Sequence, residues 1–487
     1  MRSILFLLCL AMLGRPALSD PKVVLLPLDD RPCNLLFVEQ LGRIAGARVR
    51  SPPRPWRRPP PPHRLPGWRR SQPADLKLVS LEMLCYGGLV GSRRADVPIA
   101  LARERLESLR ALTGRVDLVA TLPRLSLLTS EAQASYERRL AAWAASGSTE
   151  PPADVPAEIL AEYRFVRQRN LELLGFALDL LEDRTVHRLV VGLDDSAPRG
   201  PHLAEAAWLE GEVRRRRLQE RFSLLSGADE LSMSMLTGWL ADRAGLHPSV
   251  EVIYSDPEAA DRIPPLETMP LARMVDDHLK LAGARLASPG DVVLLVLVPG
   301  EEGIVAQVER LLSLLAAGRR VAVADLSRVN QMDPGLATAL IDRVPVHRLD
   351  ALAGWNTAAN AFGTAVAQLV AHRLAARQQG WSLERTLESE KTHQAFLMAR
   401  LVDDYAYQAV VRPRHEAGEA TALLIRLHLL DWARELFDRR WRGRVVELEA
   451  LGRQARIDSA QFEVALPWRR VFEVELRVDL RLTPVPR

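Results

Sequence analysis

The stretch HRLVVGLDDSAPRG, residues 187–200, carries the pattern that decides the fold class. Its apolar run contains no polar alternation and stops at two acidic residues, Asp194 and Asp195. A strand covered on both faces has such a continuous apolar sequence, which is typical of parallel sheets. We therefore expect a buried parallel strand at 187–193 that ends in a polar turn.

The same pattern recurs along most of the chain. The other runs are VVLLPL (23–28), LKLVSL (76–81), DLVATL (117–122), FSLLS (222–226), VEVIYS (250–255), VVLLVLV (292–298), RVAVADL (320–326) and VHRLDAL (346–352). Segments with apolar residues at three- and four-residue spacing separate them and predict helices, including two long ones at about 130–146 and 156–184. Strands that alternate with helices predict an α/β fold.

Two architectures fit this alternation. We expect a (β/α)8 barrel-like domain of parallel strands over 20–380, with the two long helices as an insertion at about 130–184. The alternative is an open doubly wound parallel sheet, because nine strand candidates compete for eight barrel positions. FSLLS is the weakest of the nine.

The two ends of the chain differ from this body. MRSILFLLCLAML followed by ALSD has the layout of a secretory signal peptide over 1–19, cleaved before Asp20. The run is short for a membrane span, although an uncleaved anchor is the alternative. We expect an exported periplasmic or extracellular protein without a stable membrane span. Helices at about 383–411 and 415–440, then the alternating RVFEVELRVDLRL, predict a mostly helical region over 381–487 that ends in a strand.

Two local features have ordinary readings. The Pro/Arg-rich segment 51–73 is expected as an exposed extended loop, since proline lacks an N–H donor; a polyproline ligand for a partner is the alternative. After cleavage only Cys33 and Cys85 remain. Two buried thiols are expected, and a disulfide between them is the alternative.

Composition and motifs exclude several classes of function. The net charge is only +4 and the basic residues are scattered, so a nucleic-acid surface is not expected. The chain contains no P-loop, no G-x-S-x-G, no H-E-x-x-H and no Gly-rich dinucleotide fingerprint after the first strand. We therefore expect no cofactor and no zinc site. A divalent cation held by carboxylates stays open.

Polar residues gather where the predicted strands end, which is where parallel α/β folds bind ligands. The stretch GWNTAANAFG, 354–363, places amides and an indole there, although Asn is a poor filler for a helix or strand. Its indole could stack on a ligand ring. The residues predicted to bind substrate are Asp29, Asp30, Arg31, Asn34, Glu82, Tyr86, Arg124, Asp325, Asn330, Trp355, Asn356 and Asn360.

Some strand-end acids have simpler explanations. Asp29 or Asp30 could pair with Arg31 or cap the next helix. Asp229, in GADE, is expected to be a helix N-cap. Glu301 and Glu302 are expected to be solvated acids of a first helical turn.

The adjacent Asp194 and Asp195 are harder to explain structurally. Two neighbouring carboxylates in a partly buried turn repel each other, which raises one pKa unless a partner intervenes. A raised acid beside an ionised one is what acid/base catalysis requires. We therefore assign Asp194 and Asp195 as the catalytic pair.

At this point the chain resembles a bacterial family classed as domain of unknown function 4127. The matching stretches are PLDDRPCN, EMLCYGGLVGSR, LDDSAPRGPH, GADE, ADLSRVNQMD, GWNTAANAFGTAVAQ and RLVDDYAYQAVVR. The resemblance implies that they form one site-bearing unit, with Asp403, Asp404 and Tyr405 closing over the pocket. It implies no established activity. Glu82 stands where the family usually has Asp, and 51–73 replaces a more regular connection.

The pattern as a whole suits a sugar, with acids for the glycosidic bond and amides for hydroxyl groups. We expect a glycoside hydrolase-like enzyme acting on a small or oligomeric carbohydrate. In its substrate-assisted hexosaminidase form, Asp195 is the general acid and Asp194 orients the substrate's acetamido group. The alternatives are a non-catalytic carbohydrate- or cell-wall-binding protein and a metal-dependent hydrolase.

Overall fold

The predicted apolar runs form parallel strands in the computed structural model, which describes residues 20–53, 73–127, 131–299, 303–415, 419–468 and 471–486. Each of the nine runs overlaps a strand, and two short strands were not predicted. The strands are β1 (Lys22–Leu26), β2 (Arg48–Arg50), β3 (Leu76–Ser80), β4 (Arg115–Leu122), β5 (Arg188–Leu193), β6 (Phe222–Ser226), β7 (Ser249–Tyr254), β8 (Arg285–Leu286), β9 (Val292–Leu297), β10 (Arg320–Asp325) and β11 (Ala351–Ala353). The parallel α/β class is therefore confirmed.

These strands divide between two sheets. The first has the order β2-β1-β3-β4-β5-β6 and the second the order β11-β10-β9-β7-β8, with parallel pairing throughout. Counted within each sheet, both contain the order 2-1-3-4-5 that is common in doubly wound sheets. The expected single barrel is not what forms, because β7 pairs with β8 and β9 and so starts a second sheet. The nine runs belong to two open sheets, closer to the alternative.

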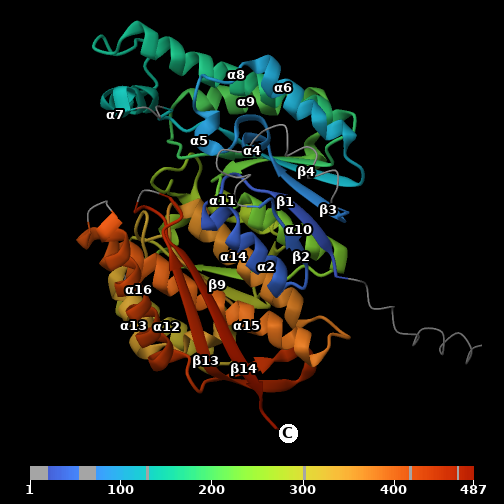
Figure 1. Cartoon of the computed structure of the whole chain (residues 1–487), viewed down its shortest axis with the longest axis vertical. Coiled ribbons are helices and arrows are strands. Elements are labelled where there is room, and N and C mark those ends of the chain that lie inside the picture. The colour runs from blue at the N-terminus through green and yellow to red at the C-terminus, as the bar shows by residue number, and fades with distance from the viewer. Residues whose placement is uncertain are drawn as a thin grey trace, which may run out of the picture.

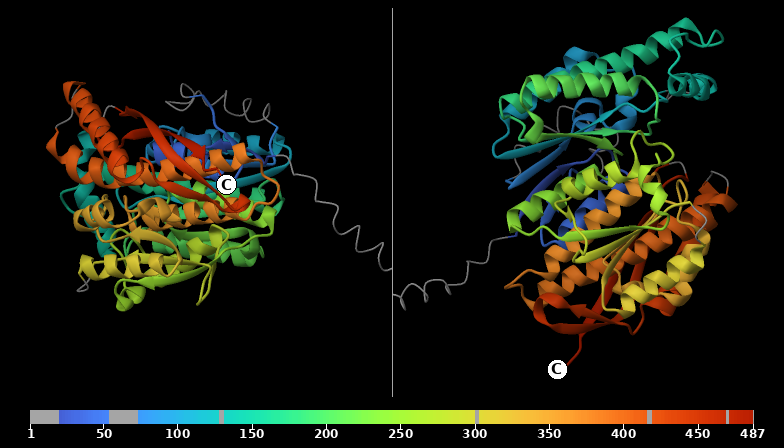
Figure 2. Two further views of the ribbon diagram at one scale, coloured as in Figure 1. Left: turned by 90° about the horizontal axis from the view of Figure 1, so that it is seen from below. Right: turned by 180° about the vertical axis from the view of Figure 1, so that it is seen from behind.

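Helices cover both faces of both sheets, so helical layers alternate with the sheets (Figures 1 and 2). The outer face of the first sheet carries α4 (Leu81–Tyr86), α6 (Ile99–Glu107), α8 (Ala157–Glu182) and α9 (Pro201–Arg215). Between the sheets lie α2 (Leu36–Ile44), α10 (Leu231–Ala244), α11 (Leu271–Leu281) and α14 (Ala358–Ala376). The far face of the second sheet carries α12 (Ile304–Ala316) and α13 (Pro334–Arg343). The short α5 (Leu89–Ser92) follows α4, and α7 (Glu131–Ser146) precedes α8.

Successive residues of a strand point to opposite faces of its sheet and therefore pack in two different hydrophobic cores. Leu25 of β1 packs in the core between the sheets, whereas Leu26 packs in the core under α4, α6, α8 and α9. Val293 and Leu294 of β9 are divided in the same way. A strand whose two faces both pack in hydrophobic cores has no exposed face, which explains the continuous apolar runs. Helix α14 is buried on nearly every side for the same reason.

The C-terminal region is richer in strands than expected. Helix α15 (Leu383–Arg400) continues as a π-helical stretch, Leu401–Val411, and is followed by α16 (Glu419–Arg440). An antiparallel sheet of β12 (Val445–Leu448), β13 (Arg453–Ala465) and β14 (Glu475–Pro484) replaces the single predicted strand. Most β13 residues are partly exposed, so the strand lacks an apolar run. In Figure 1, β13 and β14 run up the molecule, and the segment that joins them approaches the junction of the two sheets.

Several predictions concern residues at the margins of this fold. The signal peptide, most of the Pro/Arg-rich segment, and Glu301 with Glu302 lie outside the described residues. Cys33 and Cys85 are both buried and no disulfide joins them, as expected. Over the ranges that the structure describes, no helix has the length and apolarity needed to cross a membrane.

Candidate active site

A cavity of about 380 Å³ lies where strands of the two sheets end. Open α/β sheets bind ligands outside the carboxyl ends of their strands, and this cavity lies there. Its lining includes eight predicted residues, namely Asp29, Arg31, Arg124, Asp194, Asp195, Asn330, Asn356 and Asn360. Residues far apart in the sequence therefore meet at one site, as the strand-end pattern predicted.

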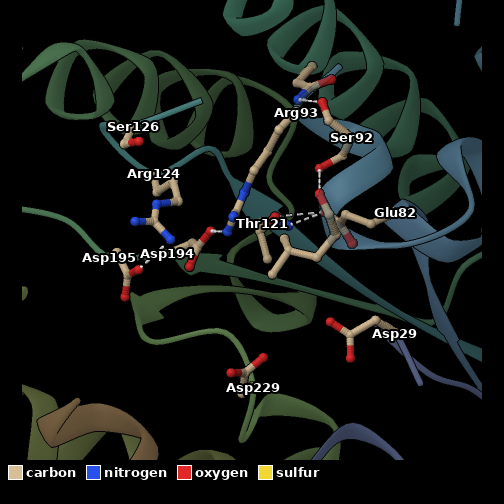
Figure 3. Close-up of polar contacts among 12 residues, drawn as sticks. Asp29, Glu82, Ser92, Arg93, Thr121, Arg124, Ser126, Asp194, Asp195 and Asp229 are labelled. Carbon is tan, nitrogen blue, oxygen red and sulfur yellow. Dashed lines mark hydrogen bonds and ion pairs between the residues drawn. The ribbon is translucent and has the colours of Figure 1, made fainter. Parts of the chain in front are cut away.

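The adjacent acids predicted to be catalytic lie directly after β5, and each has its own arginine (Figure 3). Arg93 lies 2.5 Å from Asp194, and Arg124 lies 2.9 Å from Asp195. Burial raises the pKa of Asp195, the neighbouring charge of Asp194 raises it further, and Arg124 partly offsets both. The side chain of Asp195 is nevertheless 25% exposed, against 9% for Asp194. The two adjacent acids therefore have different environments, and the pKa of the one nearer to solvent, Asp195, is raised.

The floor of the cavity is a buried ionic network around Arg31. Its guanidinium donates two hydrogen bonds to Asp229, at 2.9 and 2.5 Å, and one to Asp29 at 2.8 Å. The amide of Asn34 donates to both carboxylates. Burial and the charge of Asp29 raise the pKa of Asp229 to about 6, against the attraction of Arg31. Asp229 is thus a partner of Arg31, and the N-cap predicted for it is wrong, since Glu230 occupies the N-cap position of α10.

Two side-chain amides of the stretch GWNTAANAFG (354–363), those of Asn356 and Asn360, connect the two sheets. The side-chain amide of Asn356 donates to Asp229 at 3.3 Å and to the side-chain Oδ1 of Asn360 at 2.5 Å. Asn360 in turn donates to Glu230 at 2.6 Å. The backbone N–H of Asn330 donates to the carbonyl of Asn356. Amides are used here because each can donate to a carboxylate of the first sheet while accepting from a neighbour.

Behind Asn360 lies a buried acid–imidazole pair. Glu230 and His278 are both 0% exposed, and Glu230 Oε1 lies 3.0 Å from His278 Nε2. Although burial lowers it, the pKa of His278 is raised overall by the hydrogen bond and charge of Glu230. Gly227 and Gly363 make room for the pair, since a Cβ on either would lie within 2.3 Å of Glu230. The Asn360 amide therefore donates to a buried Glu230–His278 pair for which the two glycines leave room.

Backbone strain is concentrated at this cavity. Six non-glycine residues of the described chain have a positive φ, and four of them line the cavity: Asp195, Leu266, Asn330 and Asn356. The backbone N–H of Ser196, beside Asp195, donates to the carbonyl of Leu266, so two of these strained turns meet. Such conformations cost free energy and persist where the surrounding structure imposes them, most often at functional sites.

Matching against known protein families provides an independent comparison. A model described as "Protein of unknown function (DUF4127)" matches residues 23–477. The chain belongs to the DUF4127 family. No curated protein and no solved structure matches it. The family model covers the elements that line the cavity, so the site lies within the shared body of DUF4127 proteins.

Besides Arg93, which pairs with Asp194, three important members of this DUF4127 site were not predicted from sequence. Glu267 lines the cavity, is 1% exposed, and accepts a hydrogen bond from the backbone N–H of Ala359 at 2.9 Å. Burial, with a contribution from the charge of Glu230, raises its pKa to about 7. Trp468 and Phe472, from the segment between β13 and β14, provide the aromatic surface. None of the three follows a predicted strand, so the strand-end signal could not find them.

Trp355, the aromatic residue predicted to stack on a ligand, lies elsewhere. It packs edge-on against Phe37 with ring centroids 6.0 Å apart, and its indole N–H donates to Thr364 at 3.1 Å. It is not among the lining residues, and Trp468 is. The indole of Trp468 donates to Asp30 at 2.7 Å, so Asp30 positions a wall residue without lining the cavity itself.

Glu82 and Tyr86 belong to helix α4, which covers the outer face of the first sheet. Glu82 accepts hydrogen bonds from the backbone N–H and hydroxyl of Thr121, at 2.6 and 2.9 Å, and from Ser80. It ties the start of α4 to β4. The ring of Tyr86 lies 4.4 Å from the Arg169 guanidinium, a cation–π contact. Both side chains are buried outside the cavity lining.

The remaining predicted residues support the loops around the site. Asp325 accepts from the backbone N–H groups of Ser327 and Asp333 and so shapes the loop that carries Asn330. Asp404, from the π-helical stretch, accepts from the backbone N–H of Gly354 at 2.8 Å. It braces the GWNT stretch from behind and does not line the cavity.

Within the described ranges, no three His, Cys, Asp or Glu side chains form a group that could hold a metal ion.

Proposed function

We propose that this DUF4127 protein is an exported glycoside hydrolase-like enzyme acting on a carbohydrate. The observation that carries the proposal is the pair of adjacent acids with different environments at one cavity. Asp194 is held by Arg93, whereas Asp195 is more exposed and has a raised pKa. Acid/base catalysis at a glycosidic bond needs one carboxyl that keeps its proton beside one that does not.

The rest of the lining suits a sugar. Asn330 and Asn356 offer amide groups that can bind hydroxyls, and Trp468 with Phe472 offers aromatic surface for a ring face. A volume of about 380 Å³ is in the range of small-molecule sites.

We assign the roles as follows. Asp195 protonates the leaving-group oxygen. Asp194, with one oxygen bound by Arg93, uses the other to orient the substituent of the sugar beside the reacting carbon. In the substrate-assisted form that substituent is an acetamido group and supplies the nucleophile.

The test is a panel of chromogenic glycosides, assayed with the wild type, Asp194→Asn and Asp195→Asn. Asp261→Asn is the matched control, because Asp261 is exposed and belongs to none of the elements at the site. We expect each site variant to fold and to lose turnover by about 100-fold or more, the usual contribution of a positioned acid or base. Full activity in both variants would refute the assignment.

The alternatives give different results in the same assay. Binding without any product would indicate a non-catalytic carbohydrate-binding protein. Activity that a chelator abolishes would indicate a metal-dependent hydrolase. Export is tested separately, by locating the protein in cell fractions and determining whether the mature chain begins at Asp20.

A further inference from the structure

The charges that line the cavity are unbalanced. Five Asp or Glu side chains but only three Arg side chains are among the described lining residues. Each arginine is already bound by a carboxylate: Arg31 by Asp229, at 2.5 Å, and Arg93 and Arg124 by the two acids after β5. An anionic ligand would have to break one of these pairs. Breaking a desolvated pair is costly, so the cavity disfavours carboxylate and phosphate ligands.

Glu267 is the carboxylate without a counter-ion. Among the described residues no arginine pairs with it, and its Oε1 accepts a hydrogen bond from the backbone N–H of Ala359 at 2.9 Å. Its second oxygen, Oε2, is buried without a hydrogen-bond partner in the part of the chain that the structure describes. A buried carboxylate in this state costs free energy until a cation or donor reaches it.

We infer that the cavity binds an amino sugar through its protonated amine, with Glu267 as the counter-ion. The inference rests on the proposed function and narrows its substrate class to sugars with a free amine, which is incompatible with the substrate-assisted form because that form needs an acetamido group. A protonated amine offers three donors and one positive charge, which match the buried Glu267 Oε2 that lacks a hydrogen-bond partner. The aromatic surface of Trp468 and Phe472 adds attraction for a cation.

The experiment is isothermal titration calorimetry at pH 7 with glucosamine, N-acetylglucosamine, glucose and glucuronic acid. For the wild type we expect glucosamine to bind most tightly and glucuronic acid most weakly. Glu267→Gln should weaken glucosamine binding by about ten-fold or more, as expected for a lost charged hydrogen bond, and should change glucose binding by less than about three-fold. Asp261→Asn removes the same formal charge from the same segment between β7 and α11, and it should change neither glucosamine binding nor glucose binding.

Three results would overturn the inference. They are glucuronic acid or N-acetylglucosamine binding more tightly than glucosamine, no detectable binding of glucosamine, and an equal loss of glucose and glucosamine affinity in Glu267→Gln. The comparison of the four sugars on the wild type tests the inference even if the Glu267→Gln variant fails to fold. Because calorimetry measures binding and not turnover, it tests the amino-sugar inference separately from the proposed enzymatic activity. A preference for glucosamine without hydrolysis would support the amino-sugar ligand and reject the glycoside hydrolase proposal. Hydrolysis of glycosides without that preference would support the enzyme and reject the amino-sugar ligand.

Discussion

Replacing Glu267 with Gln should stabilise the protein only at pH values above about 4.5, and most strongly above about pH 7. Burial raises the pKa of this carboxyl from an ordinary 4.5 to about 7 in the folded protein. Between these two values the folded state holds a proton that the unfolded state releases. Stability from this group is therefore fully present below about pH 4.5, declines as pH rises, and is lost above about pH 7.

The size of the effect follows from the two pKa values. At about 1.4 kcal/mol for each pH unit, the interval from 4.5 to about 7 corresponds to about 3 kcal/mol. Glutamine has nearly the same shape and no charge, so the variant avoids this cost at pH 8. Unfolding entropy is about 2.1 cal/mol/K per residue. For 487 residues that unfold together it is about 1 kcal/mol/K, so the expected rise in Tm is about 3 °C.

The assay is differential scanning calorimetry of the wild type, Glu267→Gln and Asp261→Asn at pH 4.5 and pH 8. We expect the Glu267 variant to exceed the wild type at pH 8 and to match it, or fall slightly below it, at pH 4.5. The exposed Asp261 should have no such pH-dependent effect. A Glu267 variant with the same Tm difference at both pH values, or with lower Tm at pH 8, would refute the reasoning about its protonation.

Three further substitutions probe the site's framework. Arg31→Ala leaves two buried carboxylates unpaired and should lower the free energy of unfolding by about 3–5 kcal/mol, measured by urea denaturation. Gly363→Ala places a Cβ 2.3 Å from Glu230 and should destabilise by about 1–3 kcal/mol, whereas Gly211→Ala, with no atom within 4 Å of the new Cβ, should stabilise slightly. Trp355→Phe removes one indole hydrogen bond and should cost about 1 kcal/mol without changing sugar affinity, by calorimetry; a large affinity loss would return Trp355 to the ligand site.

Strand-end reasoning predicted much of the site because it depends on a local pattern. The acids after β5 and the Asp29–Arg31 stretch after β1 follow unbroken apolar runs, and parallel strands place their carboxyl ends at one edge. The same reasoning failed for Trp355, because an aromatic residue at a strand end can turn toward either the core or the cavity. Phe37, which is far from Trp355 in the sequence, and Thr364, which helix α14 brings beneath the indole, decide that orientation.

The sequence by itself determined the parallel α/β class and the identity of most strand-end groups, because burial on both faces requires continuous apolar runs and ligand sites require polar turns. It also determined membership of DUF4127. Only the tertiary structure decided that the nine runs split between two sheets, because pairing of β7 away from β6 depends on long-range contacts. It also decided which acids share the cavity. Glu267 lies in a loop without any local pattern, and its raised pKa comes from what the folded chain packs around it.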